Sequence, residues 1–132
     1  TDITVGSKIP NLELPPISRT TLALYAGASG DHNPIHIDID FAKKAGMPDV
    51  FAHGMLSMAY LGRMLTAWQP QSSLLRFSNK FSAITQLREV ITCSGEVVEI
   101  IEQGGETIAR CAIQAANAEG QQTLIGEALV AI

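Results

Sequence analysis

The sequence predicts an α+β fold in which an antiparallel sheet curves around one buried helix. Residues 54–68, GMLSMAYLGRMLTAW, are apolar almost all the way round, which is typical of a buried helix. Later segments are rich in Val, Ile, Leu and Thr, as strands are: 74–84, 88–102, 106–117 and 122–132. The last three are separated only by Gly104-Gly105 and Glu119-Gly120, turns too short for crossover helices, so these strands are expected to be antiparallel.

A helix of this kind needs cover on most sides, and long strands wrapped around it would supply that cover. The combination favours a hot-dog architecture. The 132 residues contain no internal repeat and no long linker, so we expect a single hot-dog domain over residues 1–132.

The composition excludes several classes of protein. Charged residues are 17% of the chain against a usual ~25%, which counts against a disordered tail or an extended coiled coil. Thirteen acidic and nine basic residues give a net charge of −4, so no nucleic-acid partner is expected. With 46% hydrophobic residues, a chain this small is expected to bury some of its surface against another chain.

Cysteine usage and the start of the chain predict a cytoplasmic protein. Cys93 and Cys111 form no metal-binding pattern and are expected to be buried free thiols. Residues 1–6 lack the basic and apolar pattern of a signal peptide, although a targeting segment lost before Thr1 stays an open alternative. The apolar stretch 54–68 is short for a membrane span and contains Arg63, so no membrane insertion is expected.

The first third of the chain is expected to be extended and then to carry short helices. Prolines keep the first sixteen residues mostly extended, and Ser18 or a following threonine caps a short helix that runs to Ala28. Gly30 and Pro34 prevent one uninterrupted helix over the next stretch. Residues 41–46 are expected to form one or two helical turns that end at a glycine.

The polar residues suited to chemistry gather in one short part of the sequence. These are Asp31, His32, Asn33, His36, Asp38 and His53. A carboxylate and an imidazole five positions apart, Asp31 and His36, could converge on one small reactant as an acid–base pair. From spacing alone the alternative stays open that Asp31 only caps a turn and His36 packs under it.

Two further patterns have competing interpretations. His32 and His36 have the spacing of a helical metal pair, but Pro34 lies between them and no third ligand is clearly spaced, so no metal is expected. His53-Gly54 opens the buried helix, where unpaired N–H groups and the helix dipole could polarise a ligand carbonyl. Alternatively, Gly54 only allows a tight entry turn. No serine lies in a GxSxG elbow, and no phosphate-binding glycine loop is present.

Residues 25–38, YAGASGDHNPIHID, resemble the signature of the MaoC-like dehydratases, also known as the (R)-specific enoyl-CoA hydratases. The FAHGML string at 51–56, Phe41-Ala42 and the aromatic strand at Arg76-Phe77 resemble the same family. The resemblance implies a hot-dog fold with active sites near a dimer interface. It also implies reversible syn addition of water to a trans-2-enoyl thioester, which gives a (3R)-hydroxyacyl thioester, without a cofactor.

The resemblance assigns roles to individual residues. Asp31 and His36 become the catalytic pair, and the Gly54 N–H becomes the donor that polarises the thioester carbonyl. Asn33, Asp38 and His53 are supporting residues. The chain departs from the family at Gly62, where some members have a serine, and at 84–87, where a Pro and a Gly-Asp commonly occur.

The expected substrate is an acyl-CoA or an acyl-carrier-protein thioester, and the expected assembly is a homodimer or a heterodimer with a related hot-dog chain. Arg76, Lys80 and Arg88 could form a positive rim for the carrier's phosphates, or they could be ordinary solvated strand charges. The function we predict is therefore that of a hydro-lyase. The alternatives are a non-catalytic acyl-binding partner subunit and, less favoured, an acyl-CoA thioesterase.

Overall fold

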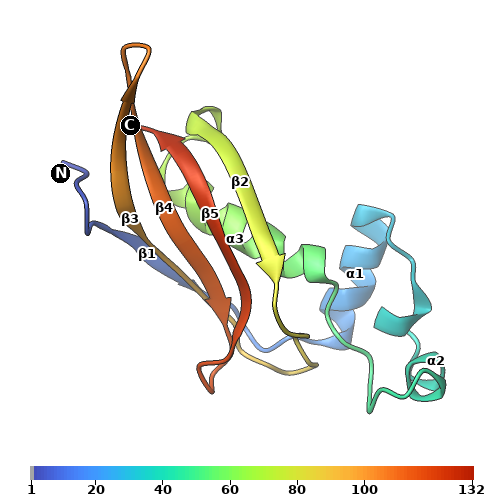
Figure 1. Cartoon of the computed structure of the whole chain (residues 1–132). Helices are drawn as coiled ribbons and strands as arrows, with labels where there is room; N and C mark the ends of the chain where they lie inside the picture. The colour runs from blue at the N-terminus through green and yellow to red at the C-terminus, as the bar shows by residue number, and fades with distance from the viewer. Residues whose placement is uncertain (1) are drawn as a thin grey trace.

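The computed structural model describes residues 2–132, and its centre is a five-stranded antiparallel sheet (Figure 1). The strands are β1 (Lys8–Glu13), β2 (Leu74–Phe81), β3 (Thr92–Gln103), β4 (Glu106–Ala116) and β5 (Gln122–Ala131). Their order across the sheet is β1-β3-β4-β5-β2, so β1 and β2 are the edge strands. Gly104 and Gly105, with φ of 60° and 82°, form the tight turn between β3 and β4, where residues other than glycine rarely fit. The antiparallel sheet expected from the short turns is confirmed.

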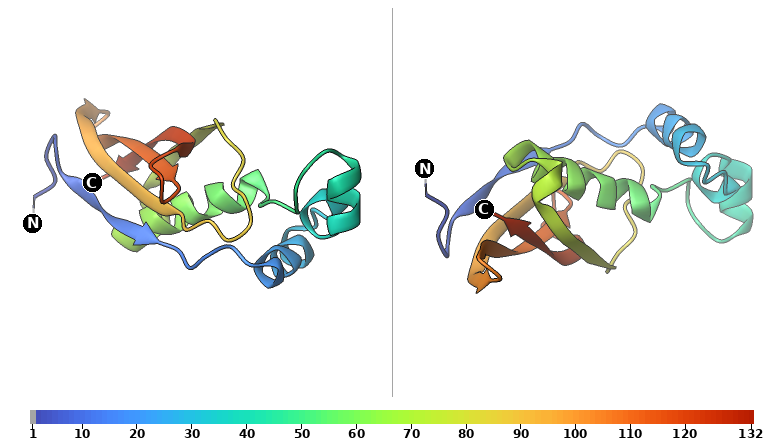
Figure 2. Two further views of the ribbon diagram at one scale, coloured as in Figure 1. Left: turned by 90° about the horizontal axis from the view of Figure 1, so that it is seen from below. Right: turned by 90° about the horizontal axis from the view of Figure 1, so that it is seen from above.

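Helix α3 (Gly54–Trp68) lies against one face of this sheet and begins and ends where the sequence predicts. Along β4 the buried residues Cys111, Ile113 and Ala115 alternate with more exposed ones and face a common core with Leu61 and Met64 of the helix. Figure 2 shows the curved sheet with the helix on its concave side. The α+β hot-dog architecture is therefore confirmed.

The expectation that the helix is covered on most sides is only partly correct. Met55, Ala59, Arg63 and Thr66 are exposed and follow one another at helical spacing, so they form a stripe turned away from the sheet. Five strands curve only part of the way round a helix, and in a single chain this stripe meets solvent.

The segment between β2 and β3 is a loop, whereas the sequence predicts strand up to residue 84 and again from residue 88. It crosses to the entry of α3, where the Ala52 N–H donates to the Thr85 carbonyl at 2.9 Å. Further along, the Arg88 N–H donates to the Ile17 carbonyl at 2.7 Å, and Arg88 has a left-handed φ of 71°. These bonds tie the loop to the rest of the chain, so it forms one wall beside the start of the helix.

Three short helices form a lobe beyond the end of the sheet: α1 (Arg19–Ser29), the 3₁₀ helix η1 (Pro34–His36) and α2 (Ile39–Lys44) (Figures 1 and 2). Ser18 caps α1 by accepting from the Thr21 N–H, as expected. The lobe has a small core of its own, which consists of Ile17, Leu22, Ala42, Val50, Ala52 and Leu56. Because Leu56 belongs to the first turn of α3, this core fixes the lobe on the start of that helix.

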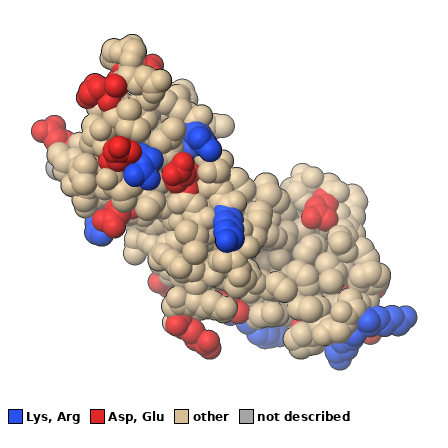
Figure 3. All heavy atoms as spheres, viewed as in Figure 1, with Lys and Arg blue, Asp and Glu red and all other residues tan. Residues whose placement is uncertain are grey.

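The surface shows mixed charge on the face drawn in Figure 3, where acidic and basic side chains are scattered among large uncharged areas. Of the helices within residues 2–132, none is long and apolar enough to cross a membrane. Cys93 and Cys111 are free and buried, as expected, and burial raises the pKa of each thiol to about 11.

Candidate active site

The loop from α1 to η1 is a compact turn that its own side chains hold. Gly30 ends α1 in the left-handed conformation, with φ of 80°, which glycine adopts without strain. Asp31 Oδ1 then accepts from the Asn33 N–H at 3.2 Å, and Asn33 Oδ1 accepts from the Ile35 N–H at 3.1 Å. These turns replace the helix that Pro34 forbids, and they bring the side chains of Asp31 and His36 to the same side of the loop.

His36 is largely buried, and one of its ring nitrogens has a fixed partner. Its Nδ1 lies 2.8 Å from the backbone carbonyl of Phe51. Since a carbonyl only accepts, Nδ1 carries a proton and donates, so that the lone pair of the neutral ring lies on Nε2. The Phe51 ring also meets the imidazole edge-on, with centroids 5.0 Å apart. The chain therefore fixes the orientation of the His36 ring and the proton on its Nδ1.

His53 is 1% exposed and contacts both members of the predicted acid–base pair. Its ring stacks on that of His36 with centroids 4.0 Å apart and an interplanar angle of 27°. Its Nε2 lies 3.2 Å from the Asp31 carbonyl, to which it donates, and its Nδ1 is buried without a partner among the described residues. Burial, and next the neighbouring His36, lowers the pKa of His53, so the His53 ring stays neutral.

Tyr25 completes this small group of rings. It meets His53 edge-on, with centroids 4.8 Å apart and planes at 68°. Burial, and to a lesser degree the Asp31 carboxylate, raises the pKa of Tyr25, so the phenol keeps its proton. The tyrosine belongs to the YAGASGDHNPIHID string, but the sequence pattern alone assigned it no role.

Asp31, His36 and His53 each place one potential metal-ligand atom within 4.8 Å of the others. The two imidazole rings are stacked, however, and the lone pair of an imidazole lies in the plane of its ring. Two nearly parallel planes 4.0 Å apart do not direct their lone pairs at one ion. The geometry therefore favours an acid–base pair, an exposed carboxylate near an imidazole, over a metal centre.

Gly54 is the first residue of α3 and directly follows His53. The first N–H groups of a helix have no partner within the helix, and the His53 side chain makes no capping bond. A Cβ at Gly54 would lie 3.0 Å from the ring of Phe81. Gly54 has no left-handed φ, so close approach, rather than a tight entry turn, explains the glycine here. The exposed N–H is available to a ligand at the positive end of the helix dipole.

A cavity of about 330 Å³ opens beside Gly54, between the start of α3, the end of β2 and the loop that follows it. Its lining includes the apolar side chains of Phe51, Phe81 and Leu124 together with the hydroxyls of Ser57 and Thr85. These two hydroxyl oxygens lie 3.5 Å apart and are buried. Sequence reasoning did not find Ser57 or Thr85, because neither belongs to a recognisable motif.

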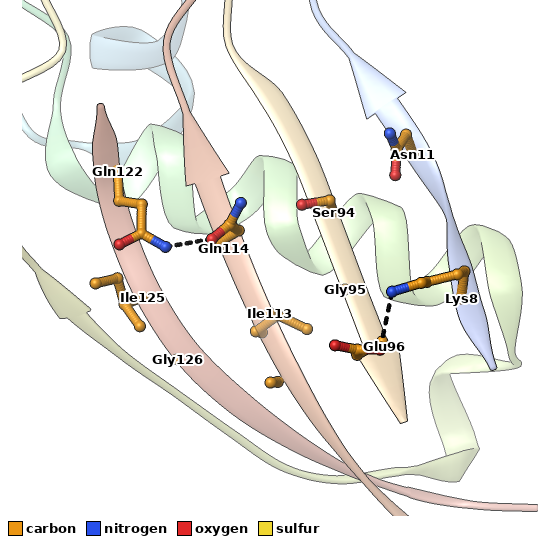
Figure 4. A pocket seen from close by; sticks show the side chains of 11 residues that line it. Lys8, Asn11, Ser94, Gly95, Glu96, Ile113, Gln114, Gln122, Ile125 and Gly126 are labelled. Carbon is orange, nitrogen blue, oxygen red and sulfur yellow. Dashed lines mark hydrogen bonds and ion pairs between the residues drawn. The ribbon is translucent and has the colours of Figure 1, made fainter. Parts of the chain in front are cut away.

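A larger hollow of about 590 Å³ lies on the outer face of the sheet, on the side away from α3 (Figure 4). Its polar side chains already pair with one another: Lys8 with Glu96 at 2.9 Å, and Gln122 with Gln114. None of the predicted site residues lines it. We therefore place the candidate site at the start of α3.

The remaining predicted site residues do not belong to the group of rings around His36. Asp38 caps α2 by accepting from the Asp40 N–H at 3.0 Å, and His32 is an exposed loop residue. Arg76 and Lys80 lie on the edge strand β2. Arg88 lies on the following loop, where its charge helps to lower the pKa of Asp49. Arg88 is thus on a different element from Arg76 and Lys80, and a phosphate-binding rim remains a prediction.

The chain belongs to the MaoC like domain family, whose match extends over residues 4–116. The (R)-specific enoyl-CoA hydratase of Rhodospirillum rubrum is 27% identical over 118 residues, which cover 88% of this chain and 80% of that protein. The 3-hydroxyacyl-thioester dehydratase X of Mycobacterium tuberculosis is 38% identical over 66 residues, but these cover 50% of this chain and only 23% of that protein.

Among solved structures, the (R)-hydratase from A. caviae involved in PHA biosynthesis has a TM-score of 0.85 and 25% identity, with 97% of this chain and 96% of that chain covered. The family and the fold predicted from sequence are thus confirmed. The comparisons identify an enzyme of the hydratase and dehydratase kind.

Proposed function

We propose that this chain catalyses the reversible addition of water to a trans-2-enoyl thioester, which yields a (3R)-hydroxyacyl thioester. The observation that carries the proposal is the close approach of the Asp31 carboxylate to the His36 imidazole, next to the start of α3. The Asp31 carboxylate and the His36 imidazole lie within 4.8 Å of each other, and the unpaired N–H of Gly54 follows the ring that stacks on His36. Relatives named as hydratases and dehydratases support the same reaction class.

The acid–base pair orients the water molecule and takes a proton from it. Asp31 accepts one hydrogen of the water and orients it, and the lone pair on His36 Nε2 takes the other proton as the oxygen attacks C3. The proton then passes from the pair to C2 on the same face, which completes a syn addition. In the reverse direction the same two groups remove the C2 proton and protonate the leaving hydroxyl.

The Gly54 N–H stabilises the charge that develops on the thioester oxygen of the substrate. As water adds at C3, electron density moves onto the thioester oxygen, which becomes enolate-like. A backbone donor at the start of a fifteen-residue helix stabilises that charge in place, because it needs no reorganisation during the reaction.

We further propose that a second hot-dog chain, identical or related, covers this site. Asp31 is exposed in the single chain, and several large apolar residues around the lobe and the cavity are also exposed: Ile37, Phe41, Met55, Phe81 and Ile84. The exposed stripe along α3 adds to this surface. In so open a site the acyl chain and the developing enolate-like charge would face bulk solvent, and a partner chain would cover them.

The carrier of the acyl group is coenzyme A or an acyl carrier protein in this proposal, and the chain acts in the cytoplasm as one hot-dog unit without a cofactor. Arg76 and Lys80, both exposed on β2, would meet the carrier's phosphate from the edge of the sheet. Arg88 would contribute only from a separate position on the following loop.

The test is to mix the purified chain with crotonyl-CoA, follow the loss of enoyl-thioester absorbance, and determine the chirality of the product. We expect hydration and (3R)-3-hydroxybutyryl-CoA. Binding of the thioester without turnover would instead identify a non-catalytic partner subunit. Release of free thiol would identify a thioesterase.

A further inference from the structure

We propose that the Ser57 hydroxyl is a second donor to the thioester carbonyl, beside the Gly54 N–H, and that Thr85 is the positioning residue that orients it. The inference rests on the proposed function and adds two residues to it. Both hydroxyls line the cavity that opens at Gly54, and both residues are nearly inaccessible, with exposed fractions of 2% for Ser57 and 4% for Thr85.

The hydrogen-bond count leaves one donor free. Two hydroxyl groups bring two O–H donors, and the contact between them at 3.5 Å uses one. Among the described residues, neither hydroxyl makes another hydrogen bond. A buried donor without a partner is destabilising, so a polar group is expected to meet it inside the cavity.

The helix geometry indicates which oxygen that group is. Ser57 lies three residues after Gly54, and helical side chains point back over the preceding turn. The Ser57 hydroxyl therefore lies over the turn that carries the unpaired Gly54 N–H. An oxygen atom that accepts from Gly54 is then close to Ser57, and two donors stabilise its developing charge better than one.

The arrangement of Thr85 is fixed by its own backbone. The Thr85 carbonyl accepts from the Ala52 N–H at 2.9 Å, and a β-bridge joins the next residue, Gln86, to Phe51. The loop is thus tied to the two residues that precede His53 and Gly54. If the Thr85 hydroxyl donates to Ser57, the Ser57 hydroxyl donates to the substrate, and each bond polarises the next.

Kinetics of crotonyl-CoA hydration test the two roles. We expect S57A to lower kcat about 100-fold with little change in KM, as for loss of one oxyanion donor. T85V should lower kcat less, and T85S, which keeps the hydroxyl, should restore it. The control is T107A, which removes a hydroxyl that donates to the Glu102 carboxylate beside the β3–β4 turn. It should leave kcat unchanged, and thermal melts verify that each variant is folded.

A spectroscopic measurement separates this inference from the proposed reaction. A bound dienoyl thioester such as hexadienoyl-CoA absorbs at longer wavelength when its carbonyl is polarised. We expect the red shift in the wild type to shrink in S57A. A red shift and a kcat that S57A leaves unchanged would overturn the role of Ser57, while the proposed reaction would stand. A wild-type chain that binds the thioester without turnover but shows the shift would overturn only the reaction. A chain that binds no thioester would overturn both.

Discussion

The imidazole rings of His36 and His53 stack at 4.0 Å, and each ring donates one N–H to a backbone carbonyl. His36 donates to Phe51 and His53 donates to Asp31, which fixes the protonated nitrogen of each ring. In the neutral form of His36, Nε2 then carries the lone pair that can accept a proton from a water molecule. The two stacked histidines thus connect the loop that carries the Asp31 carboxylate to the helix that carries the Gly54 N–H.

Replacement of His53 separates its two contacts. His53→Gln keeps a donor for the Asp31 carbonyl, whereas His53→Phe keeps a ring against His36 but has no donor. We expect H53F to lower kcat by about 10-fold to 100-fold, because Asp31 shifts relative to the substrate, and H53Q to retain most of the activity. Nitrogen NMR shifts of His36 report its tautomer in each variant. Equal kcat values in both variants and in the wild type would show that His53 has no role in the reaction.

His53 also predicts how stability depends on pH. Its pKa is lowered in the folded chain, whereas the unfolded chain has the ordinary histidine value of about 6.5. Below about pH 6.5 the unfolded state therefore binds a proton that the folded state does not, and the free energy of unfolding falls as the pH falls. Above this range His53 contributes no pH dependence.

Urea unfolding at about pH 7.5 and about pH 5.5, on either side of the ordinary pKa, measures this effect. We expect the loss of stability between the two values to be smaller in H53Q than in the wild type. All other titrating groups are the same in both proteins, so an identical loss would contradict a lowered pKa of His53.

The two glycines of α3 that face β2 are expected to differ in their tolerance of alanine. A Cβ at Gly54 would lie 3.0 Å from the Phe81 ring, whereas a Cβ at Gly62 would lie 3.5 Å from the Phe77 ring, an ordinary contact. We expect G54A to lower kcat, because its methyl group would displace either the Phe81 ring that lines the cavity or the start of α3 that carries the N–H. G62A should leave kcat intact and raise the free energy of unfolding by about 0.5–1 kcal/mol through helix propensity. Steady-state kinetics and urea unfolding check both variants, and G54A with wild-type kcat would argue against a ligand at this N–H.

Assembly is expected to depend on the apolar surface near the site. Met55 is 54% exposed on the first turn of α3, and Met55→Glu should weaken association and reduce activity at low protein concentration. Val5→Glu is the matched control, since Val5 is 62% exposed but precedes β1, away from the site. Sedimentation over a range of concentrations measures both variants. Unchanged association of the Met55 variant would place the partner elsewhere.

The parts of the fold that were predictable depend on short-range rules. The helix at 54–68 and the β3–β4 turn follow from apolar periodicity and from glycines, and both were predicted with the correct bounds. The loop after β2 was not predicted. Its shape comes from hydrogen bonds to Ala52 and Ile17, which are distant in sequence.

The same division holds for the candidate site. Asp31 and His36 lie in one recognisable string and Gly54 lies at a predicted helix start, so the approach of Asp31 to His36 and the position of Gly54 were predictable. The stacking of His53 on His36 depends on how the lobe packs on α3, and the approach of Thr85 to Ser57 depends on the β2–β3 loop. No local pattern reports either contact, because each is made by segments at least 17 residues apart.

The most direct test of the account is the rate of crotonyl-CoA hydration in two nearly isosteric variants, Asp31→Asn and His36→Gln. Each keeps the size of the side chain but removes the carboxylate charge or the basic lone pair. We expect kcat to fall by about 10²–10⁴-fold in each, with the folded state retained by circular dichroism. Hydration at the wild-type rate in either variant would contradict the assignment of Asp31 and His36 as the pair that activates water.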